Sequence, residues 1–523
     1  MKRHTSTSLP KRLALLTGTL LHLGIQAQDP TDALRWSWTQ SAGTARQQAI
    51  GGSMTSLGGD LSATFVNPAG LGFFRTGDLV LSPAFQQIRQ QADYLNRKEA
   101  AQQRQQLSFG TSGLILTASE TTRKGKKQVS VVSLAVNRSG HFRNDILYRG
   151  QNNQTSYSNK FLEEIQGIRD ANVVANQFPN SASLAFNTYW IDTIAGGTNG
   201  NFQFKSRAPI ATGLLQENWI RQSGGITELA IGYGGTTDDK LYYGATFGIP
   251  FLNYDRVAQF TEADATTALN NFDYARVEDY LDTKGMGINL KLGMIYRPNL
   301  YWRLGVAFHT PTWYQLKDNY RTVITTDTEN YKGEQTQSSA LFNNGSPGSF
   351  QYNLTTPYRA LVSASYVLRS TKDIRKQRGF LTADLEYVNH QAVQYTPNSE
   401  VDNSTETKAY LKSLNQAIDH AYKGVFNLRL GGEIKVNTWM VRGGAAFLGN
   451  PYEDLAGEKG SRMQLSGGLG YRDRGIYVDL TYVHLTGTDI HTPYRLANAA
   501  FPMARIQQRG AQVVLTFGIK LES

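Results

Sequence analysis

The sequence predicts an all-β protein, a transmembrane β-barrel of about 14 antiparallel strands. Three observations support this prediction. Apolar and polar residues alternate within short segments, the gaps between these segments alternate between short and long, and no apolar run suits a membrane helix. Only 40% of the 523 residues are hydrophobic and 18% are charged, and the mean hydropathy is -0.40. Beyond Ile25 no apolar run approaches the roughly 18 residues that a membrane-spanning helix needs.

The first 27 residues have the pattern of a secretory signal peptide. Residues 2–12 carry four Lys and Arg side chains, and residues 13–25 are mostly apolar. We expect cleavage after Ala27, which leaves Gln28 first and, by removing four positive charges, takes the formal net charge from +11 to +7. The chain contains no Cys, so the exported protein has no disulfide, thiolate metal site or cysteine nucleophile.

Residues 28–76 separate this peptide from the first alternating segment. They are rich in Gly, Ala and Ser and do not alternate, and they are too long to be only a leader into the first strand. Within them Pro68 fixes its own φ, and the Asn67 side chain can bond its own turn, which Ala69 and Gly70 complete. The apolar residues around this turn either pack on the barrel wall or contact an apolar ligand: Phe65, Leu71, Phe73 and Phe74.

From residue 77 to the end of the chain, alternation predicts the barrel strands. They begin near residues 77, 106, 127, 225, 239, 283, 301, 357, 378, 424, 438, 461, 474 and 510. The last segment is the clearest, because one face is apolar and the other mostly polar. We expect Val513, Leu515 and Phe517 to face lipid, and Gln512 and Thr516 to face the lumen.

The gaps between strands predict the orientation of the barrel. Short turns near residues 236–239, 297–299 and 472–474 alternate with long loops near 87–105, 149–224, 253–282, 315–356, 393–423 and 487–509. Outer-membrane barrels have short periplasmic turns, long outer loops and rings of aromatic residues at the strand ends. Eight aromatic residues are candidates for these rings: Tyr243, Tyr296, Trp302, Trp313, Tyr366, Trp439, Tyr471 and Tyr482.

Two long loops have helical rather than strand periodicity. One predicted helix covers residues 158–176 and the other residues 407–421. Their apolar faces either cap the barrel rim or collect a ligand; the residues concerned are Phe161, Leu162 and Ile165 in the first, and Leu411, Leu414 and Ile418 in the second.

Charged residues fall on the predicted lumen faces of several strands: Asp384, Glu386, Arg429, Glu433, Arg442 and Asp479. Opposite charges in a confined lumen pair with each other, which predicts a structural network that braces the plug. The alternative is a substrate-carboxylate site that uses Arg429 or Arg442, because an arginine fork binds a carboxylate through two hydrogen bonds.

The sequence predicts no catalysis and no cofactor. It has no nucleophile elbow and no Ser and His that its pattern brings together. His309, His390 and His484 fall near strand ends at spacings that indicate no metal site. The basic turns at 123–127 and 372–378 lie on the predicted periplasmic side, where nucleic acid has no access, so nucleic acid is not an expected partner.

The segment 28–76 resembles the N-terminal hatch of the FadL/TodX family of outer-membrane transporters for hydrophobic compounds. The resemblance lies in Ala45-Arg46, in residues 49–53, in Asp60 and in Asn67-Pro68-Ala69. Further stretches look like the Bacteroidetes branch of that family: Asn137-Arg138, Phe142-Arg143, Ser223-Gly224 with Glu228, Gly285 with Asn289, residues 309–313, Thr356-Pro357 and residues 450–452. The family fold is a barrel of 14 strands with a small plug inside, which agrees with the strand count above.

The resemblance implies an outer-membrane protein, in contact with lipid and lipopolysaccharide, that passes long-chain fatty acids or other hydrophobic molecules by passive diffusion through a hatch-gated barrel at residues 77–523. It assigns the gate to residues 67–70. It also implies sideways release at a kink in the third strand, formed here by Asn137, Arg138, Ser139 and Gly140, where glycine weakens pairing. The alternative function is an interaction protein, because relatives in this superfamily serve type IX secretion and bind surface or periplasmic proteins.

Overall fold

The computed structural model describes residues 30–38, 42–121, 127–194, 202–368, 378–454, 460–497 and 499–521. The predicted signal peptide and most of the two predicted basic turns lie outside these residues. No helix in the described part of the chain is both long and apolar enough to span a membrane.

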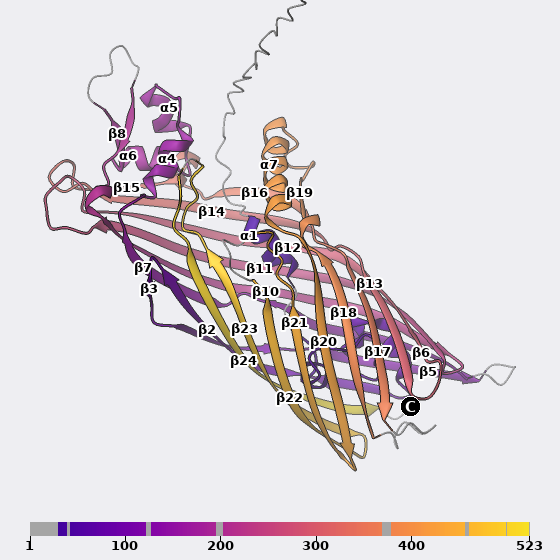
Figure 1. Ribbon diagram of the computed structural model, residues 1–523. Helices are drawn as coiled ribbons and strands as arrows, with labels where there is room; N and C mark the ends of the chain where they lie inside the picture. The colour runs from indigo at the N-terminus through magenta and orange to yellow at the C-terminus, as the bar shows by residue number, and fades with distance from the viewer. Residues whose placement is uncertain are drawn as a thin grey trace, which may run out of the picture.

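The described residues form one closed barrel (Figure 1). Eight barrel strands are continuous: β10 (Leu214–Thr237), β11 (Leu241–Asp264), β12 (Tyr274–Tyr296), β20 (Gly424–Val436), β21 (Trp439–Leu448), β22 (Arg462–Asp473), β23 (Ile476–His491) and β24 (Ala504–Leu521). Six are interrupted: β1 (Gly77–Leu81) with β2 (Pro83–Tyr94); β3 (Arg97–Lys98) with β4 (Gln102–Phe109) and β5 (Ser112–Thr121); β6 (Lys127–His141) with β7 (Asn144–Asn152); β13 (Trp302–His309) with β14 (Trp313–Asp327); β15 (Glu334–Ser338) with β16 (Gly348–Thr355) and β17 (Arg359–Leu368); and β18 (Gly379–Asn389) with β19 (Gln394–Pro397).

Pairing between the first and last strands closes the barrel. Gly77 lies opposite Leu521, and β24 also pairs with β2. All the pairings are antiparallel, and the closed sheet has the predicted 14 strands. Closure satisfies the backbone groups that an open sheet edge would expose to lipid.

Strand lengths differ from the prediction at the loop end of the barrel. The segments predicted to begin near 225, 283 and 510 begin at Leu214, Tyr274 and Ala504. The regions 87–105, 253–282 and 315–356, predicted to be loops, are mostly strand. The sequence pattern did not indicate these loop-end parts of the strands, because neither of their faces contacts lipid. Apolar and polar residues therefore do not alternate there.

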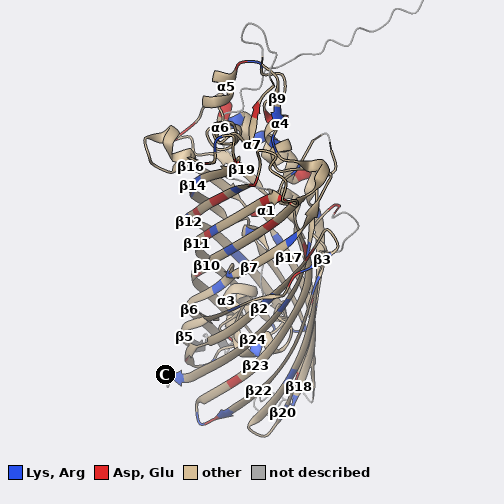
Figure 2. Ribbon diagram, turned by 90° about the vertical axis from the view of Figure 1, so that its left-hand side faces the viewer, with Lys and Arg blue, Asp and Glu red and all other residues tan. Residues whose placement is uncertain are grey.

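Helices gather at the loop end, together with many charged residues (Figure 2). The predicted helix at 158–176 is instead two helices, α4 (Ser158–Glu164) and α5 (Ala171–Asn176), followed by α6 (Ala182–Asn187), which the sequence pattern did not indicate. The helix predicted at 407–421 is α7 (Thr405–Ala421). Short elements complete this end: β8 (Ile191–Thr193) paired with β9 (Phe204–Ser206), η2 (Ile210–Thr212), η3 (Ser339–Asn343) and η5 (His390–Ala392).

The outer surface of the barrel is apolar where the strands alternate. Val513 and Phe517 of β24 are 40% and 44% exposed, whereas Gln512 and Thr516 are buried inside. Seven of the eight predicted ring aromatics are exposed large side chains, and Trp302 with Tyr366, and Trp439 with Tyr471, pack edge to face. This surface has the composition that lipid requires.

We expect Leu515→Arg to destabilise the barrel by about 2–4 kcal/mol, because Leu515 lies on the outward face and the change buries a charge in lipid. Urea unfolding in liposomes measures the effect, with Leu515→Met as the uncharged control. A substitution of Thr516, which faces the lumen, would not serve as a control. The Thr516 hydroxyl accepts a hydrogen bond of 2.8 Å from the backbone N–H of Ala45, so its loss would itself affect stability. Equal stability of the two Leu515 variants would contradict the assigned face.

Candidate functional site

Residues 42–76 lie inside the barrel and contact its wall on several sides. This segment comprises α2 (Ala45–Ala49), α3 (Ala63–Val66) and η1 (Pro68–Phe73), and most of its residues are buried. The helix α2 contacts β21 to β24, whereas η1 contacts β6 and β10 to β12. The segment therefore spans the lumen, and we refer to residues 42–76 as the lumen segment.

A row of inward glycines on the wall receives the turn at Asn67 and Pro68. Gly234, Gly244 and Gly293 are direct cross-strand neighbours on β10, β11 and β12. A Cβ on Gly244 would lie 2.4 Å from the Pro68 carbonyl carbon, and one on Gly293 would clash with the Asn67 amide. The Asn67 amide nitrogen donates to the carbonyl oxygens of Thr55 (2.6 Å) and Val306 (3.2 Å). The turn thus fits a wall from which side chains are missing.

A second glycine pair receives the lumen segment on another part of the wall. Gly431 and Gly444 are paired on β20 and β21. A Cβ on Gly444 would lie 2.1 Å from the backbone nitrogen of Gly51, and one on Gly431 would lie 2.3 Å from the carbonyl oxygen of Ile50. Both contacts are with backbone, which cannot move aside as a side chain can. The lumen segment is held between two glycine-lined surfaces.

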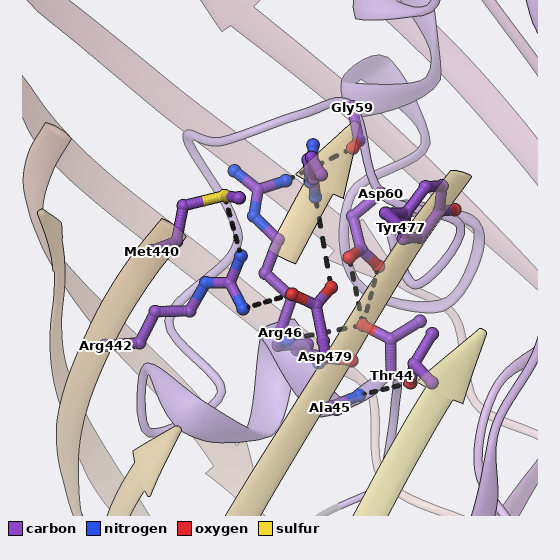
Figure 3. A network of polar contacts seen from close by, with 12 residues as sticks. Thr44, Ala45, Arg46, Gly59, Asp60, Met440, Arg442, Tyr477 and Asp479 are labelled. Carbon is purple, nitrogen blue, oxygen red and sulfur yellow. Dashed lines mark hydrogen bonds and ion pairs between the residues drawn. The ribbon is translucent and has the colours of Figure 1, made fainter. Parts of the chain in front are cut away.

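Buried charges of the wall lie beside the lumen segment (Figure 3). Arg442, whose side chain has no exposed surface, pairs with Glu433 at 2.6 Å and with Asp479 at 2.5 Å. Arg46 of α2 joins this group through Glu433 at 3.4 Å. Since both Arg442 partners are carboxylates of the wall, the guanidinium is already neutralised, which supports the structural interpretation of this residue over a substrate-carboxylate site.

Asp384 of β18 accepts hydrogen bonds from the lumen segment. Its carboxylate accepts hydrogen bonds from the backbone N–H groups of Met54 and Thr55, both at 2.9 Å, and from the Ser53 hydroxyl at 2.7 Å. Hydrogen bonds between a carboxylate and backbone N–H groups are strong ones. Asp384, like Glu433 with its contact to Arg46, therefore joins the segment to the wall.

A cavity of about 170 Å³ lies between the lumen segment and α1 (Pro30–Ser37). Its apolar lining includes Trp36 and Trp38 from the α1 end, Phe65 of the lumen segment and Tyr314 of the wall. The helix α1 lies on the loop-end side, beside α7 (Figure 1). The N-terminal part of the chain therefore lines the cavity on two sides.

The remaining wall of the cavity is polar. Lys291 pairs with Glu228, and Arg429 pairs with Glu386 at 2.7 Å. Arg359 also lines the cavity, and in the described residues its one hydrogen bond goes to the carbonyl oxygen of Ser37, at 3.2 Å. Glu386 and Arg429, both predicted lumen residues, thus face the cavity, whereas the other four predicted members lie at the lumen segment.

Two buried donors at the cavity lack an acceptor among the described residues. They are the amide nitrogen of Gln464, a residue 2% exposed, and the indole N–H of Trp36, a residue 4% exposed. A buried donor without an acceptor is costly. With Arg359 they give the cavity wall an excess of hydrogen-bond donors.

Residues from the family-like stretches converge on this cavity although they are far apart in sequence. The lining includes Asn137, Glu228, Asn289, His309, Thr310, Thr312, Thr356 and Pro357. Sequence reasoning missed Trp36, Lys291, Arg359 and Gln464 as site residues. Arg359 follows Thr356-Pro357 directly, and that adjacency was the available signal.

The barrel wall has a gap in its backbone pairing next to the cavity. In the described residues β4 pairs with β2 and β7 pairs with β10, but no backbone pairing joins β4 to β7. The ion pair between Arg104 and Asp145 bridges them instead. On the outside, Leu107 of β4 is 84% exposed. We refer to the boundary between β4 and β7 as the seam.

The third strand is irregular beside the seam, within the predicted kink. Arg138 lies opposite Thr227 and Gly140 opposite Ile226, so Ser139 is an extra residue without a partner, a β-bulge. Asn137 and Ser139 line the cavity. The structure therefore brings the predicted kink and the lumen cavity together.

The predicted apolar contacts of the lumen segment are mostly with the wall. Of the four residues only Phe65 lines the cavity. Phe73 stacks on Tyr242 with ring centroids 3.9 Å apart, and Leu71 contacts the glycine row. Phe74 packs in a cluster with Val80 and Val129 of the wall.

The outer helices pack their predicted apolar faces inward. Leu411, Leu414 and Ile418 of α7 are buried in a cluster with Leu34 of α1. Phe161 of α4 and Ile165, which directly follows that helix, are buried in a second cluster, and Leu162 is partly buried against the same cluster. The two interpretations of these helices, as caps of the rim or as collectors of a ligand, both stay predictions.

Glu262 anchors the α4 loop at the loop end of β11, beyond the last outward apolar residues. Its carboxylate accepts the backbone N–H of Tyr157 at 3.1 Å, the Gln216 amide at 3.1 Å and the Ser156 hydroxyl. Burial raises the pKa of Glu262 to about 7, against the opposing effect of these hydrogen bonds. Within the described ranges no group of three or more His, Cys, Asp or Glu is placed to hold a metal ion.

Comparison with solved structures identifies the same fold. A FadL homologue from Pseudomonas aeruginosa matches with a TM-score of 0.55 and 12% identity over 93% of this chain and 100% of that chain. The toluene transporter TodX of Pseudomonas putida (TM-score 0.47, 11% identity, 92% of this chain and 99% of that chain) and the toluene transporter TbuX of Ralstonia pickettii (0.47, 11%, 92% and 98%) also match. No family model and no curated protein matches the chain.

The resemblance seen in the sequence is thus confirmed for the fold. Together with the apolar outer surface, this fold places the chain in the bacterial outer membrane.

Proposed function

We propose that this protein passes hydrophobic small molecules, with long-chain fatty acids as the predicted class, passively across the outer membrane. The supporting observation is a lumen cavity with aromatic lining that lies next to a seam in the wall. The FadL homologue of the same fold adds support. The surroundings of the barrel are outer-membrane lipid and lipopolysaccharide.

The route runs from the loop end into the cavity and then sideways into lipid through the seam. Two apolar side chains of β4, Leu107 and Phe109, are exposed on the outside of the seam. A hydrophobic ligand that leaves through the seam therefore contacts apolar surface. Burial of apolar area contributes about 25 cal/mol per Å². Sideways exit lets the ligand avoid the lumen segment, which the two glycine-lined surfaces hold in place.

In this proposal residues 67–70, the predicted gate, do not move and only keep the lumen plugged. Its turn is seated in the glycine row, so we assign the moving part to the seam rather than to the plug. The alternative of a barrel that binds surface or type IX secretion proteins stays a prediction.

Deletion of Ser139 tests the route. Without the extra residue, β6 can pair regularly with β10 past Ile226, and the wall beside the cavity straightens. We expect uptake of a labelled long-chain fatty acid by whole cells to fall to the level of cells that lack the protein. The variant should still reach the outer membrane and migrate as a folded barrel.

Ser139→Ala is the matched control, because it keeps the residue count and so the bulge. Its uptake should equal that of the wild type. Normal uptake by a folded Ser139 deletion would refute exit at the seam, and uptake no greater in the wild type than in cells without the protein would refute transport itself.

A further inference from the structure

The outer surface of four neighbouring strands, β23, β24, β2 and β4, changes from apolar to polar toward the loop end. Its last large apolar side chains form one cross-strand row, and each of them is 40% or more exposed: Tyr482, Val513, Phe85 and Leu107. Side chains two residues apart lie on the same face of a strand. The next two rows of this face carry polar side chains and no carboxylate, among them Gln87, Gln105, Gln103, Thr486, Arg89 and Arg509.

Two arginines lie at the centre of these polar rows. Arg89 of β2 and Arg509 of β24 are directly opposite each other, and both are exposed. The Cβ atoms of such neighbours are about 4.5–5.5 Å apart, and like charges at this spacing destabilise a sheet. Among the residues that the structure describes, neither arginine side chain makes a hydrogen bond or an ion pair. The two guanidinium groups are therefore free to share an anion.

Other exposed cations of the outer surface have carboxylate partners. Lys284 of β12 also lies opposite a cation, Lys317 of β14, but Asp282 pairs with Lys284 at 2.7 Å. Across the seam, Arg149 of β7 pairs with Glu99 at 3.2 Å. An exposed cation on this barrel thus does not by itself indicate a binding site, whereas the pair formed by Arg89 and Arg509 does.

The height of the arginine pair matches a lipid head group. Arg89 and Arg509 each lie four residues from the last large apolar side chain of their strand, Phe85 and Val513. Four residues span about 13 Å along a strand, or about 10 Å in height at the usual tilt of a barrel strand. In the outer leaflet of a bacterial outer membrane, this height is occupied by the phosphorylated sugars of lipopolysaccharide.

The side chains of the polar rows suit a phosphorylated sugar. An arginine fork binds phosphate through two parallel hydrogen bonds. Glutamine amides and threonine hydroxyls both donate and accept hydrogen bonds, as sugar hydroxyls do. Because the two rows contain no carboxylate, no charge of the protein repels a phosphate there.

We propose that this surface binds one lipopolysaccharide molecule. Arg89 and Arg509 hold a phosphate of its lipid A sugars, the flanking glutamines bind the sugar hydroxyls, and the acyl chains lie on the apolar row below. The proposal goes beyond the proposed function, because the site holds its lipid whether or not the barrel passes a ligand.

Native mass spectrometry of the folded barrel in detergent tests the ligand class. The probes are diphosphorylated lipid A, the same lipid A with its phosphates removed, and phosphatidylglycerol, which has a phosphate but no sugar. We expect dephosphorylated lipid A to bind roughly 10- to 100-fold more weakly than diphosphorylated lipid A, the range for hydrogen bonds to a charged group. Phosphatidylglycerol should also bind more weakly, because it leaves the glutamines without a partner.

The double variant Arg89→Gln with Arg509→Gln tests the two residues. Its affinity for diphosphorylated lipid A should fall roughly 10- to 100-fold, to the level of the dephosphorylated lipid. Arg149→Gln with Arg221→Gln is the matched control. It removes the same charge from the outer surface, but those arginines already pair with carboxylates, so its affinity should equal that of the wild type. Migration as a folded barrel checks both variants.

The single variant Arg509→Gln separates binding from a merely structural role. In phosphatidylcholine liposomes the two guanidinium groups repel each other, so we expect the variant to unfold at a higher urea concentration than the wild type. In liposomes that also contain lipid A, the bound phosphate stabilises the wild type. There the variant should unfold at the lower urea concentration.

Several outcomes would overturn the site. They are equal binding of lipid A with and without its phosphates, phosphatidylglycerol binding as tight as that of lipid A, wild-type affinity in the Arg89 and Arg509 double variant, and an equal loss in the control. A stability change of the same sign in both kinds of liposome would overturn it as well. None of these results bears on the Ser139 deletion, so failure of this site and failure of transport are distinguishable.

Discussion

Gly444→Ala should open the barrel to small ions, whereas Gly443→Ala, one residue away, should leave it closed. Gly444 faces the lumen, and a Cβ there would lie 2.1 Å from the backbone nitrogen of Gly51. Gly443 faces outward, and a Cβ there would meet nothing within 4 Å. In a strand, alanine is otherwise the more stable of the two residues by about 0.5–1 kcal/mol, so a harmful effect at Gly444 must come from the lumen segment.

Overpacking of this kind costs about 1–3 kcal/mol. If the lumen segment gives way rather than the barrel, its undocked fraction rises roughly 5- to 150-fold. Conductance across planar lipid bilayers measures the leak, and migration as a folded barrel checks that the wall is intact. A closed Gly444→Ala barrel would show that the glycine pair is not what seats the segment.

The lipid-facing half of the fold was predictable from the sequence because lipid imposes a strict alternation. In β24, outward Val513 and inward Gln512 differ in polarity as well as in direction. At the loop end the same strands lose this contrast. Gln216 and Asn218 of β10 are buried there, whereas Leu215 is 49% exposed, so polarity no longer indicates direction.

The lumen segment was predictable as a unit but its seating was not. The sequence contains Gly234, Gly244 and Gly293 at distant positions, and only the strand register places them side by side in one row. The helix α1 was missed because eight residues give little periodicity. Arg359 was likewise visible in the sequence, but its hydrogen bond to the Ser37 carbonyl oxygen and its place in the cavity wall depend on three-dimensional neighbours.

Arg442 supplies the last and largest expected effect on stability. Arg442→Met keeps an unbranched side chain of similar reach but leaves Glu433 and Asp479 buried without their shared cation. Removing one partner of a buried ion group costs about 3–5 kcal/mol, because the remaining charges stay desolvated and repel each other. We expect the variant to unfold at lower urea concentration in liposomes, as followed by tryptophan fluorescence.

The control variant also removes the two carboxylates that Arg442→Met leaves without their cation. In the triple variant Arg442→Met, Glu433→Gln and Asp479→Asn, no buried carboxylate of this group remains, and Arg46 keeps its hydrogen bonds to the carbonyl oxygens of Gly58 and Gly59. Most of the lost stability should therefore return. Recovery would show that Arg442 neutralises wall carboxylates. If the triple variant is instead as unstable as Arg442→Met, the guanidinium acts through packing or its contacts with Met440, and the charge network does not brace the lumen segment. Wild-type stability of Arg442→Met alone would contradict the bracing role outright and make Arg442 available to a ligand again.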